Sequence, residues 1–169
     1  MIERFPKPLG LTLPIRDERE SLSKTLRALE KLVTKKEITL GRMSREDMLV
    51  TLALASSCIP MSVELTEMAV NHALKRWLEE EGSMLRIDHV ELRRTLIDLC
   101  FWTRDGYGRA YRRPPLQEGH IGYEQITALQ AINVAQFVAE ARTRSDALRA
   151  QRLGEHAKAD SSSGSTSSH

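Results

Sequence analysis

The sequence predicts a mainly α-helical fold that carries a single β-hairpin. Three observations indicate this fold class. Apolar residues recur at helical spacing along most of the 169 residues. Capping residues precede several of these apolar stretches. Aromatic residues make up only 5% of the chain and long alternating β-branched runs are few, so helix should dominate.

The first part of the chain predicts an irregular arm followed by two helices. Residues 1–16 contain three prolines and show no hydrophobic period. From residue 17 to about residue 35, leucines on one face predict an amphipathic helix. After a short connector, Ser44 and Asp47 form a variant capping box before MLVTLALASSC. Because this run is apolar nearly all round, we place its helix in the centre of the core.

A short strand and a further helix should follow. Pro60 is expected to end the central helix, and residues 61–65 predict one short strand. Thr66 is expected to cap a helix that runs to about Glu80. The connector over residues 81–87 is longer than the turn of about 3–4 residues in a tight helix-turn-helix.

The segment DHVELRRTLIDLCFWTRDGYGRAYRR, from Asp88 to Arg113, organises our interpretation. Asp88 and Glu91 form another capping pair, and three leucines at helical spacing follow. Bulky and β-branched residues then favour extended chain, and Asp105 to Gly108 supply a turn before a returning strand. The element order helix, short strand, helix, connector, helix, hairpin is that of a winged helix-turn-helix-like domain, here with an extra N-terminal helix.

An apolar stripe from about Tyr123 to about Gly154 predicts one long C-terminal helix. The stripe has no evident partner within its own segment, which favours a homodimer formed through this helix. The alternative is packing against the N-terminal helix of the same chain. The serine-rich end predicts a disordered tail. The predicted organisation is an irregular arm (1–16), a winged-helix-like domain with its leading helix (17–116), a long C-terminal helix (117–158) and a disordered tail (159–169).

The net charge of +2 is too small to identify a nucleic-acid partner, but the charges are unevenly placed. Residues 85–113 contain seven arginines and four acids, and residues 142–158 contain five basic and two acidic residues. Each of these segments therefore carries an excess of three positive charges.

The cysteines and the hydropathy bear on the compartment. Cys58 and Cys100 lie in apolar helical contexts and are expected to be buried thiols, which suits a reducing cytoplasm. We find no signal segment and no apolar run near the length of about 20 residues that spans a bilayer. A cytoplasmic protein is therefore expected.

The region from about Leu26 to Arg113 resembles a bacterial domain of unknown function, DUF2087. The segment LTEMAVNHALKRW is similar to one motif of that family, through Thr66, Glu67, Val70, Asn71, Leu74, Arg76 and Trp77. The segment HVELRRTLIDLCFWTRDGYGRAY is similar to another, through Leu92, Arg93, Arg94, Leu96, Asp98, Arg104, Gly108 and Tyr111. Cys100 stands where the family more often has glycine, so a different turn out of the helix is expected. The resemblance implies a link to transcriptional regulation and no particular activity.

Arg93 and Arg94 are the first candidates for a binding role. On the reading helix of a winged domain, a guanidinium can form two hydrogen bonds to guanine or contact phosphate. Arg94 points away from the apolar stripe and Arg93 lies at its flank. The alternatives are that Arg94 pairs with Asp98 one turn later and that Arg93 bridges to a neighbouring helix.

The hairpin supplies the second group of candidates. Four arginines frame its turn: Arg104, Arg109, Arg112 and Arg113. Such residues suit contacts of a wing with the phosphate backbone or the minor groove, although a charge run is more often only a solvated face. Tyr107 at the tip can touch a sugar or a base, or fold down on Trp102.

The remaining polar and aromatic residues give weaker signals. Trp77, Trp102 and Tyr111 are expected in the core, with a ligand pocket as the alternative. Asn71 and His72 suit a phosphate contact or the satisfaction of a neighbouring backbone.

No motif points to catalysis. The histidines and cysteines lack metal-ligand spacing, and no phosphate-binding glycine loop or nucleophile elbow appears. We therefore expect no enzymatic activity, no cofactor and no metal. The expected function is a transcriptional regulator that binds double-stranded DNA, and the alternative is a protein–protein interaction module of the same fold. An effector in a groove beside the long helix is a third possibility, without support from individual residues.

Overall fold

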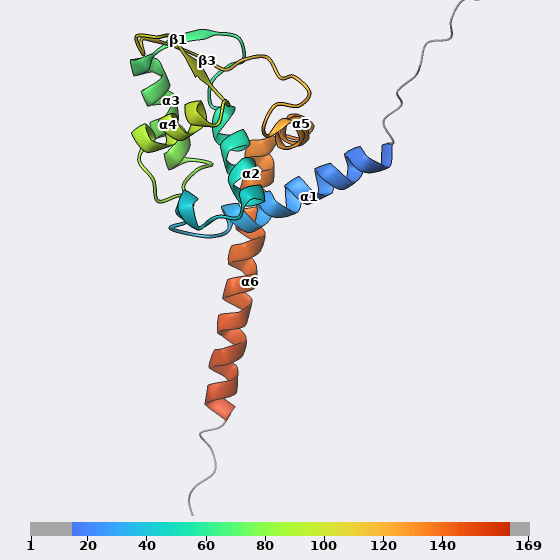
Figure 1. Cartoon of the computed structure of the whole chain (residues 1–169). Coiled ribbons are helices and arrows are strands. Elements are labelled where there is room, and N and C mark those ends of the chain that lie inside the picture. Colours follow the sequence, from blue (N-terminus) through green and yellow to red (C-terminus); the bar gives the residue numbers. More distant parts are fainter. Residues whose placement is uncertain (1–14, 163–169) are drawn as a thin grey trace, which may run out of the picture.

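The computed structural model describes residues 15–162 and the side chains of residues 17–158 (Figure 1). The arm predicted for residues 1–16 lies outside the described residues except for residues 15 and 16, which belong to the first helix. The tail predicted for residues 159–169 lies outside them except for residues 159–162, which continue the last helix.

The structure is mainly helical with a small antiparallel sheet and a long C-terminal helix, which confirms the predicted mainly α-helical class. The helices are α1 (Ile15–Val33), the 3-10 helix η1 (Leu40–Arg42), α2 (Arg45–Ser56), α3 (Glu67–Glu79), α4 (His89–Asp98), α5 (Tyr123–Gln130) and α6 (Val134–Ser162), and the strands are β1 (Glu64–Thr66), β2 (Thr103–Arg104) and β3 (Ala110–Arg112). None of the described helices has the length and apolarity needed to cross a bilayer.

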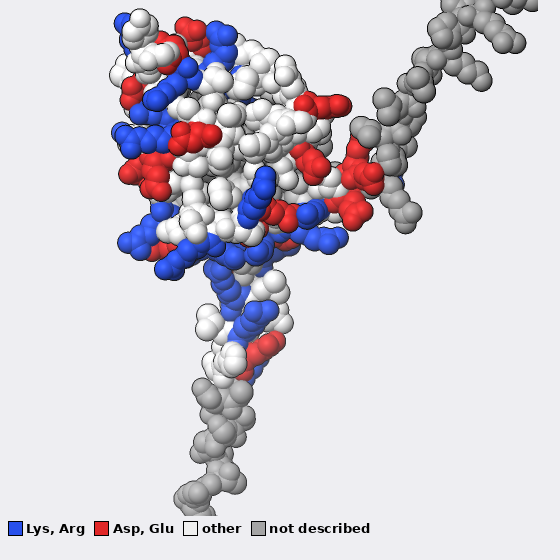
Figure 2. All heavy atoms as spheres, viewed as in Figure 1, with Lys and Arg blue, Asp and Glu red and all other residues white. Residues whose placement is uncertain are grey.

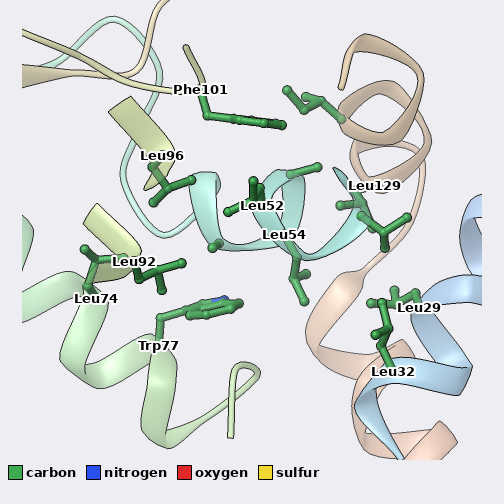
Figure 3. Close-up of a cluster of buried hydrophobic side chains, with 14 of the residues drawn as sticks. Leu29, Leu32, Leu52, Leu54, Leu74, Trp77, Leu92, Leu96, Phe101 and Leu129 are labelled. Atoms are coloured by element: carbon green, nitrogen blue, oxygen red, sulfur yellow. The ribbon is translucent and has the colours of Figure 1, made fainter. Parts of the chain in front are cut away.

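Helix α2 occupies the centre of the core, as its apolar sequence predicts. Every residue from Val50 to Ser56 is buried. Figure 3 shows Leu52 and Leu54 between leucines of α1 and α5 on one side and the side chains of α3 and α4 on the other. Burying each such leucine contributes roughly 1.5–3 kcal/mol, so this central helix is the main apolar support of the fold.

Three predicted caps are present and explain where three helices begin. The Ser44 hydroxyl accepts a hydrogen bond from the Asp47 amide (3.1 Å), and the Thr66 hydroxyl accepts one from Ala69 (3.2 Å). The Asp88 carboxylate accepts hydrogen bonds from the two amides at positions 90 and 91, each at 2.8 Å. Each cap satisfies amides that have no partner within the helix.

The three strands form one antiparallel sheet in the order β1-β3-β2. Leu65 of β1 is opposite Tyr111 of β3, and Thr103 of β2 is opposite Arg112. The first strand begins later than predicted because Ser62 adopts a left-handed φ of 61° and interrupts the extended chain. The element order from α2 to β3 is the predicted one.

The long C-terminal helix begins later than predicted, at Val134 and not at about Tyr123, because the predicted stretch contains two helices. A turn at residues 131–133 separates α5 from α6, because Asn133 caps the new helix by accepting a hydrogen bond from the Gln136 amide at 3.1 Å. Ile126 and Leu129 of α5 and Val138 of α6 are buried, and the two helices pack against α1. For these residues the alternative, packing on the N-terminal helix, is correct.

The second half of α6 projects from the end of the body opposite the sheet (Figure 1), and its root is held by Arg144 to Glu30 (3.0 Å) and by Arg149 to the Thr34 carbonyl oxygen (2.7 Å). Leu148 and Leu153 are exposed on this projecting part.

Gly122 gives a test of the packing that links α5 to the hairpin. It has a φ of +79°, and a Cβ there would lie 2.6 Å from Cζ of the buried Phe101. Gly119 has a similar φ of +83°, but a Cβ there would meet nothing within 4 Å. We expect Gly119→Ala to destabilise the protein by about 1–2 kcal/mol and Gly122→Ala by a further 1–3 kcal/mol or so, because only the latter overpacks the core. Equal midpoints of urea unfolding would contradict this assignment.

Candidate nucleic-acid interface

Arg93 is held inside a polar cluster between α3, α4 and β3. Its guanidinium forms an ion pair with Glu67 (2.7 Å) and donates a short hydrogen bond to the side-chain oxygen of Asn71. It also lies 5.4 Å from the centre of the Tyr111 ring, as in a cation–π contact. Only 11% of the Arg93 side chain is exposed. The alternative that Arg93 bridges to a neighbouring helix is therefore correct, and its guanidinium does not face solvent.

This cluster unites residues of both motifs found in the sequence. Glu67 and Asn71 belong to the first motif, and Arg93 and Tyr111 to the second. The sequence interpretation assigned Arg93 to a DNA groove and Asn71 to a phosphate contact or a cap. The structure instead uses both side chains to join two helices and a strand.

Arg94 differs from its neighbour in every respect. It is exposed, and it forms no hydrogen bond or ion pair with any described residue, so the alternative pairing with Asp98 is absent. Its charge contributes, after larger causes, to the lowered pKa of the Asp88 carboxyl, which is set mainly by the hydrogen bond from the Glu91 amide. The guanidinium of Arg94 is free for a partner outside the chain.

The hairpin turn is built around Asp105. Its carboxylate accepts hydrogen bonds from the amides of Arg109 (2.7 Å) and Ala110 (3.1 Å), and Gly108 supplies a φ of +69°. The hydrogen bond from Ala110 is the first cause of a lowered pKa of the Asp105 carboxyl. The carboxylate is therefore engaged with the backbone of the turn, and it holds the returning strand in place.

Three candidate side chains extend from the hairpin into solvent. Tyr107 is 82% exposed at the tip, so it does not fold down on Trp102. The guanidinium of Arg109 lies 4.8 Å from the centre of the Tyr107 ring. Arg104 is exposed and, like Arg109, forms no ion pair with a described residue. A tyrosine flanked by two arginines can contact a sugar and adjacent phosphates.

The last two candidates behave differently from one another. Arg112 is exposed and pairs with Glu64 of the neighbouring strand at 3.0 Å. Because both side chains are more than half exposed, this pair is weak and exchangeable. Arg113 is only 9% exposed, and burial lowers the pKa of its guanidinium. Arg113 is therefore not part of the exposed surface that a DNA partner could contact.

A small cavity beside Arg113 contains a residue that the sequence interpretation did not single out. Arg113, Phe101 and His120 are among the residues that line it. The Nε2 atom of His120 lies 2.6 Å from the carbonyl oxygen of Cys100, whereas its buried Nδ1 has no partner among the described residues. A lone histidine between two glycines, with no motif around it, gave no signal in the sequence.

The aromatic residues Trp77, Trp102 and Tyr111 are buried, as expected of core residues. Trp102 donates a hydrogen bond from Nε1 to the carbonyl oxygen of Ser56 (3.2 Å), which fixes the start of the hairpin on α2. Within the part of the chain that the structure describes, no three His, Cys, Asp or Glu side chains are placed to hold a metal ion.

The candidate surface is thus smaller than predicted and mixed in charge. Arg94, Arg104 and Arg109 are its exposed arginines without a carboxylate partner among the described residues. Figure 2 shows acidic and basic side chains side by side over the edge formed by α3, α4 and the sheet. The segment excess of three positive charges does not appear on the surface, because two of the arginines turn inward.

A comparison with known protein families finds a match to the region that contains α3, α4 and the hairpin. Residues 38–113 match the DUF2087 family model, described as an uncharacterized protein conserved in bacteria. The predicted resemblance is therefore confirmed, except for the residues before position 38. The DUF2087 match covers a little under half of the chain, from the strand-like bridge at Ile38 to the end of the hairpin. No curated protein and no solved structure matches the chain.

The end of α4, at Cys100, can be compared with the glycine that is more usual at this position in DUF2087. Cys100 is exposed, contrary to the expectation of a buried thiol, and it adopts a left-handed φ of 61°. This conformation favours glycine, the residue expected there from the family. By contrast, burial raises the pKa of the Cys58 thiol to about 12, so that cysteine is a neutral core-edge residue.

Replacing Arg93 tests the structural role of the cluster. Arg93→Met should destabilise the protein by about 1–3 kcal/mol, because the partners of the guanidinium at Glu67 and Asn71 lose their donor. Arg94→Met removes the same charge one residue later and should change the free energy of unfolding, measured by urea titration, by less than about 0.5 kcal/mol. A similar loss for both variants would show that the cluster does not stabilise the fold.

Replacing Cys100 tests the strain at the end of α4. Cys100→Gly should raise the free energy of unfolding by up to about 1 kcal/mol, because glycine adopts this φ without a steric penalty. Cys100→Ala retains the penalty and should give no such gain. Thermal unfolding of the two variants measures the difference, and a destabilised glycine variant would refute the assignment.

Proposed function

We propose that this protein is a non-enzymatic transcriptional regulator that binds double-stranded DNA through the hairpin and the exposed side of α4. The observation that carries the proposal is that Arg94, Arg104 and Arg109 are exposed and form no ion pair with a described residue. Cations without a carboxylate partner lose little on binding phosphate. Tyr107 beside Arg109 adds a flat surface for a sugar or base.

The arrangement of elements supports a winged-helix interpretation. A strand between the first two helices of the domain pairs with the returning strand of the hairpin, and α4 directly precedes that hairpin. In such domains the helix before the wing enters the major groove. Similarity to winged-helix domains supports DNA binding only by analogy of fold. The specific argument for DNA binding rests on the exposed arginines.

The electrostatics predict modest affinity. Exposed acids on the same side include Glu91 and Asp98, and Arg112 is shared with Glu64. With about three or four phosphate contacts, the logarithm of the binding constant should fall with the logarithm of salt concentration with a slope of about −3. A buried Arg93 adds nothing to this slope.

Removing the two unpaired hairpin arginines tests the proposal. Arg104→Ala/Arg109→Ala should lower affinity for sheared genomic duplex at least tenfold at low salt and reduce the salt slope by about two. Fluorescence anisotropy at two salt concentrations measures both quantities.

The matched control is Arg27→Ala/Arg45→Ala, which removes two exposed charges from α1 and α2. It should leave the slope unchanged. Equal losses of duplex affinity in both double variants would show that the effect depends only on net charge. Absence of duplex binding by the native protein would exclude the DNA proposal.

A protein-interaction module is the second candidate, and the mixed charge of the surface favours it. Met68 is exposed on the first turn of α3, and Figure 2 shows acidic and basic side chains mixed over the edge formed by α3, α4 and the sheet. Such a surface suits a partner with complementary charges. A defined protein partner that is lost on Met68→Asp, together with no binding of duplex at low salt, would support this candidate over the first.

Homodimerisation through the C-terminal helix stays a prediction. The exposed leucines of the projecting part, Leu148 and Leu153, lie about 140° apart on a helix, so they do not form one seam. Scattering mass measures the oligomeric state directly.

A further inference from the structure

A cleft of about 410 Å³ lies where the end of α1, the connector before α4 and helix α6 meet. Its lining is unusually basic. Five of the lining side chains are cationic and two are acidic: Lys35, Lys36, Arg86, Arg142 and Arg149 against Glu37 and Asp146. The cleft is therefore lined with an excess of three positive charges drawn from three separate segments of the chain.

The walls of the cleft are fixed by hydrogen bonds. Arg142 donates to the carbonyl oxygens of Val33 (3.2 Å), Glu80 (3.1 Å) and Glu81 (2.9 Å), which joins α6 to the ends of α1 and α3. The connector is held to the chain after α1, because the Arg86 amide donates to Ile38 at 2.8 Å. These contacts exist before any ligand binds, so the cationic side chains line a preformed site.

Three of the five cations of the cleft, Lys35, Lys36 and Arg86, are available to a ligand, whereas Arg142 and Arg149 donate to backbone carbonyl oxygens. The side chains of Lys35 and Lys36 are exposed and form no hydrogen bond or ion pair with a described residue. Arg86 and Glu37 are 3.7 Å apart and both about three-quarters exposed, which makes a weak pair. The pair of Arg149 with Asp146 is equally long, at 3.7 Å.

The carbonyl oxygens at the end of α1 oppose an anion, and the arginines of α6 offset them. The C-terminus of a helix carries partial negative charge. Arg142 covers the carbonyl of Val33, and Arg149 donates to that of Thr34 at 2.7 Å. The two lysines that follow α1 therefore face the cleft without competition from those carbonyls.

We propose that this cleft binds a compact anion carrying two or more phosphate groups. Its volume lies in the range of small-molecule sites, about 300–1,000 Å³. An excess of three charges matches a multiply charged anion better than a single carboxylate. Among the residues that the structure describes, no aromatic side chain lines the cleft, so recognition rests on phosphate and not on stacking of a base.

The position of the cleft separates it from the proposed DNA surface. The sheet lies at one end of the body and α6 leaves at the other (Figure 1), and Figure 2 shows lysines and arginines gathered around the root of α6. The inference therefore does not depend on DNA binding by the hairpin.

Calorimetry of the full chain with sodium tripolyphosphate tests the proposal, with divalent cations absent and ionic strength constant. Orthophosphate and sulfate serve as comparison anions. Tripolyphosphate should bind saturably and at least tenfold more tightly than orthophosphate. Lys35→Ala/Lys36→Ala should weaken its binding at least tenfold, because it removes the two unpaired cations of the cleft.

The matched control is Arg27→Ala/Arg45→Ala, which removes the same net charge from α1 and α2 outside the cleft lining and should leave tripolyphosphate binding unchanged. Equal affinity for all three anions, or equal losses in both double variants, overturns the cleft proposal. The proposal is also overturned if the native chain does not bind tripolyphosphate and Lys35→Ala/Lys36→Ala loses duplex binding. That result would assign the cleft to nucleic acid. The effect of Arg104→Ala/Arg109→Ala on duplex binding bears only on the proposed function, so the two failures are distinguishable.

Discussion

The ion pair between Arg93 and Glu67 is the interaction on which the arrangement of the DUF2087 region depends. It joins α4 to α3, and the Tyr111 ring beneath the guanidinium adds β3 to the same junction. A nearly buried guanidinium without partners would cost several kcal/mol, so the three elements must approach one another closely enough to satisfy it. That requirement sets the rotation of α4 about its axis. Because Arg93 turns inward, the next residue, Arg94, must face solvent.

Local signals in the sequence predicted the elements well, and their limits are physical. The caps at Ser44, Thr66 and Asp88 involve atoms only two or three residues apart, so spacing alone identifies them. The break before α6 also depends on a local cap, at Asn133, but the apolar stripe continues through it and concealed it. A hydrophobic period therefore predicts which residues are covered better than it predicts whether one helix or two cover them.

The candidate site was less predictable because it depends on contacts between distant residues. A helical wheel placed Arg93 at the flank of the buried stripe, and no property of its own helix decides whether a flank is covered. The decision comes from Glu67 and Asn71, which lie more than 20 residues earlier. The same holds for Arg113, whose burial depends on the packing of the loop that follows it. Counting arginines in a segment overestimates a surface when such partners exist.

The distribution of unpaired charge gives the molecule two chemically different ends. At the sheet, arginines are interspersed with acids, so a partner there must supply charges of both signs or tolerate weak phosphate contacts. At the root of α6, cations from the ends of α1, the connector and α6 converge, although each segment alone looks like an ordinary solvated helix end. Arg142 supports this convergence because it joins α6 to the ends of α1 and α3 through three backbone carbonyls, and one of these, that of Val33, lies in the cleft lining. A net charge of +2 therefore conceals a separation of charge that the fold, and not the composition, produces.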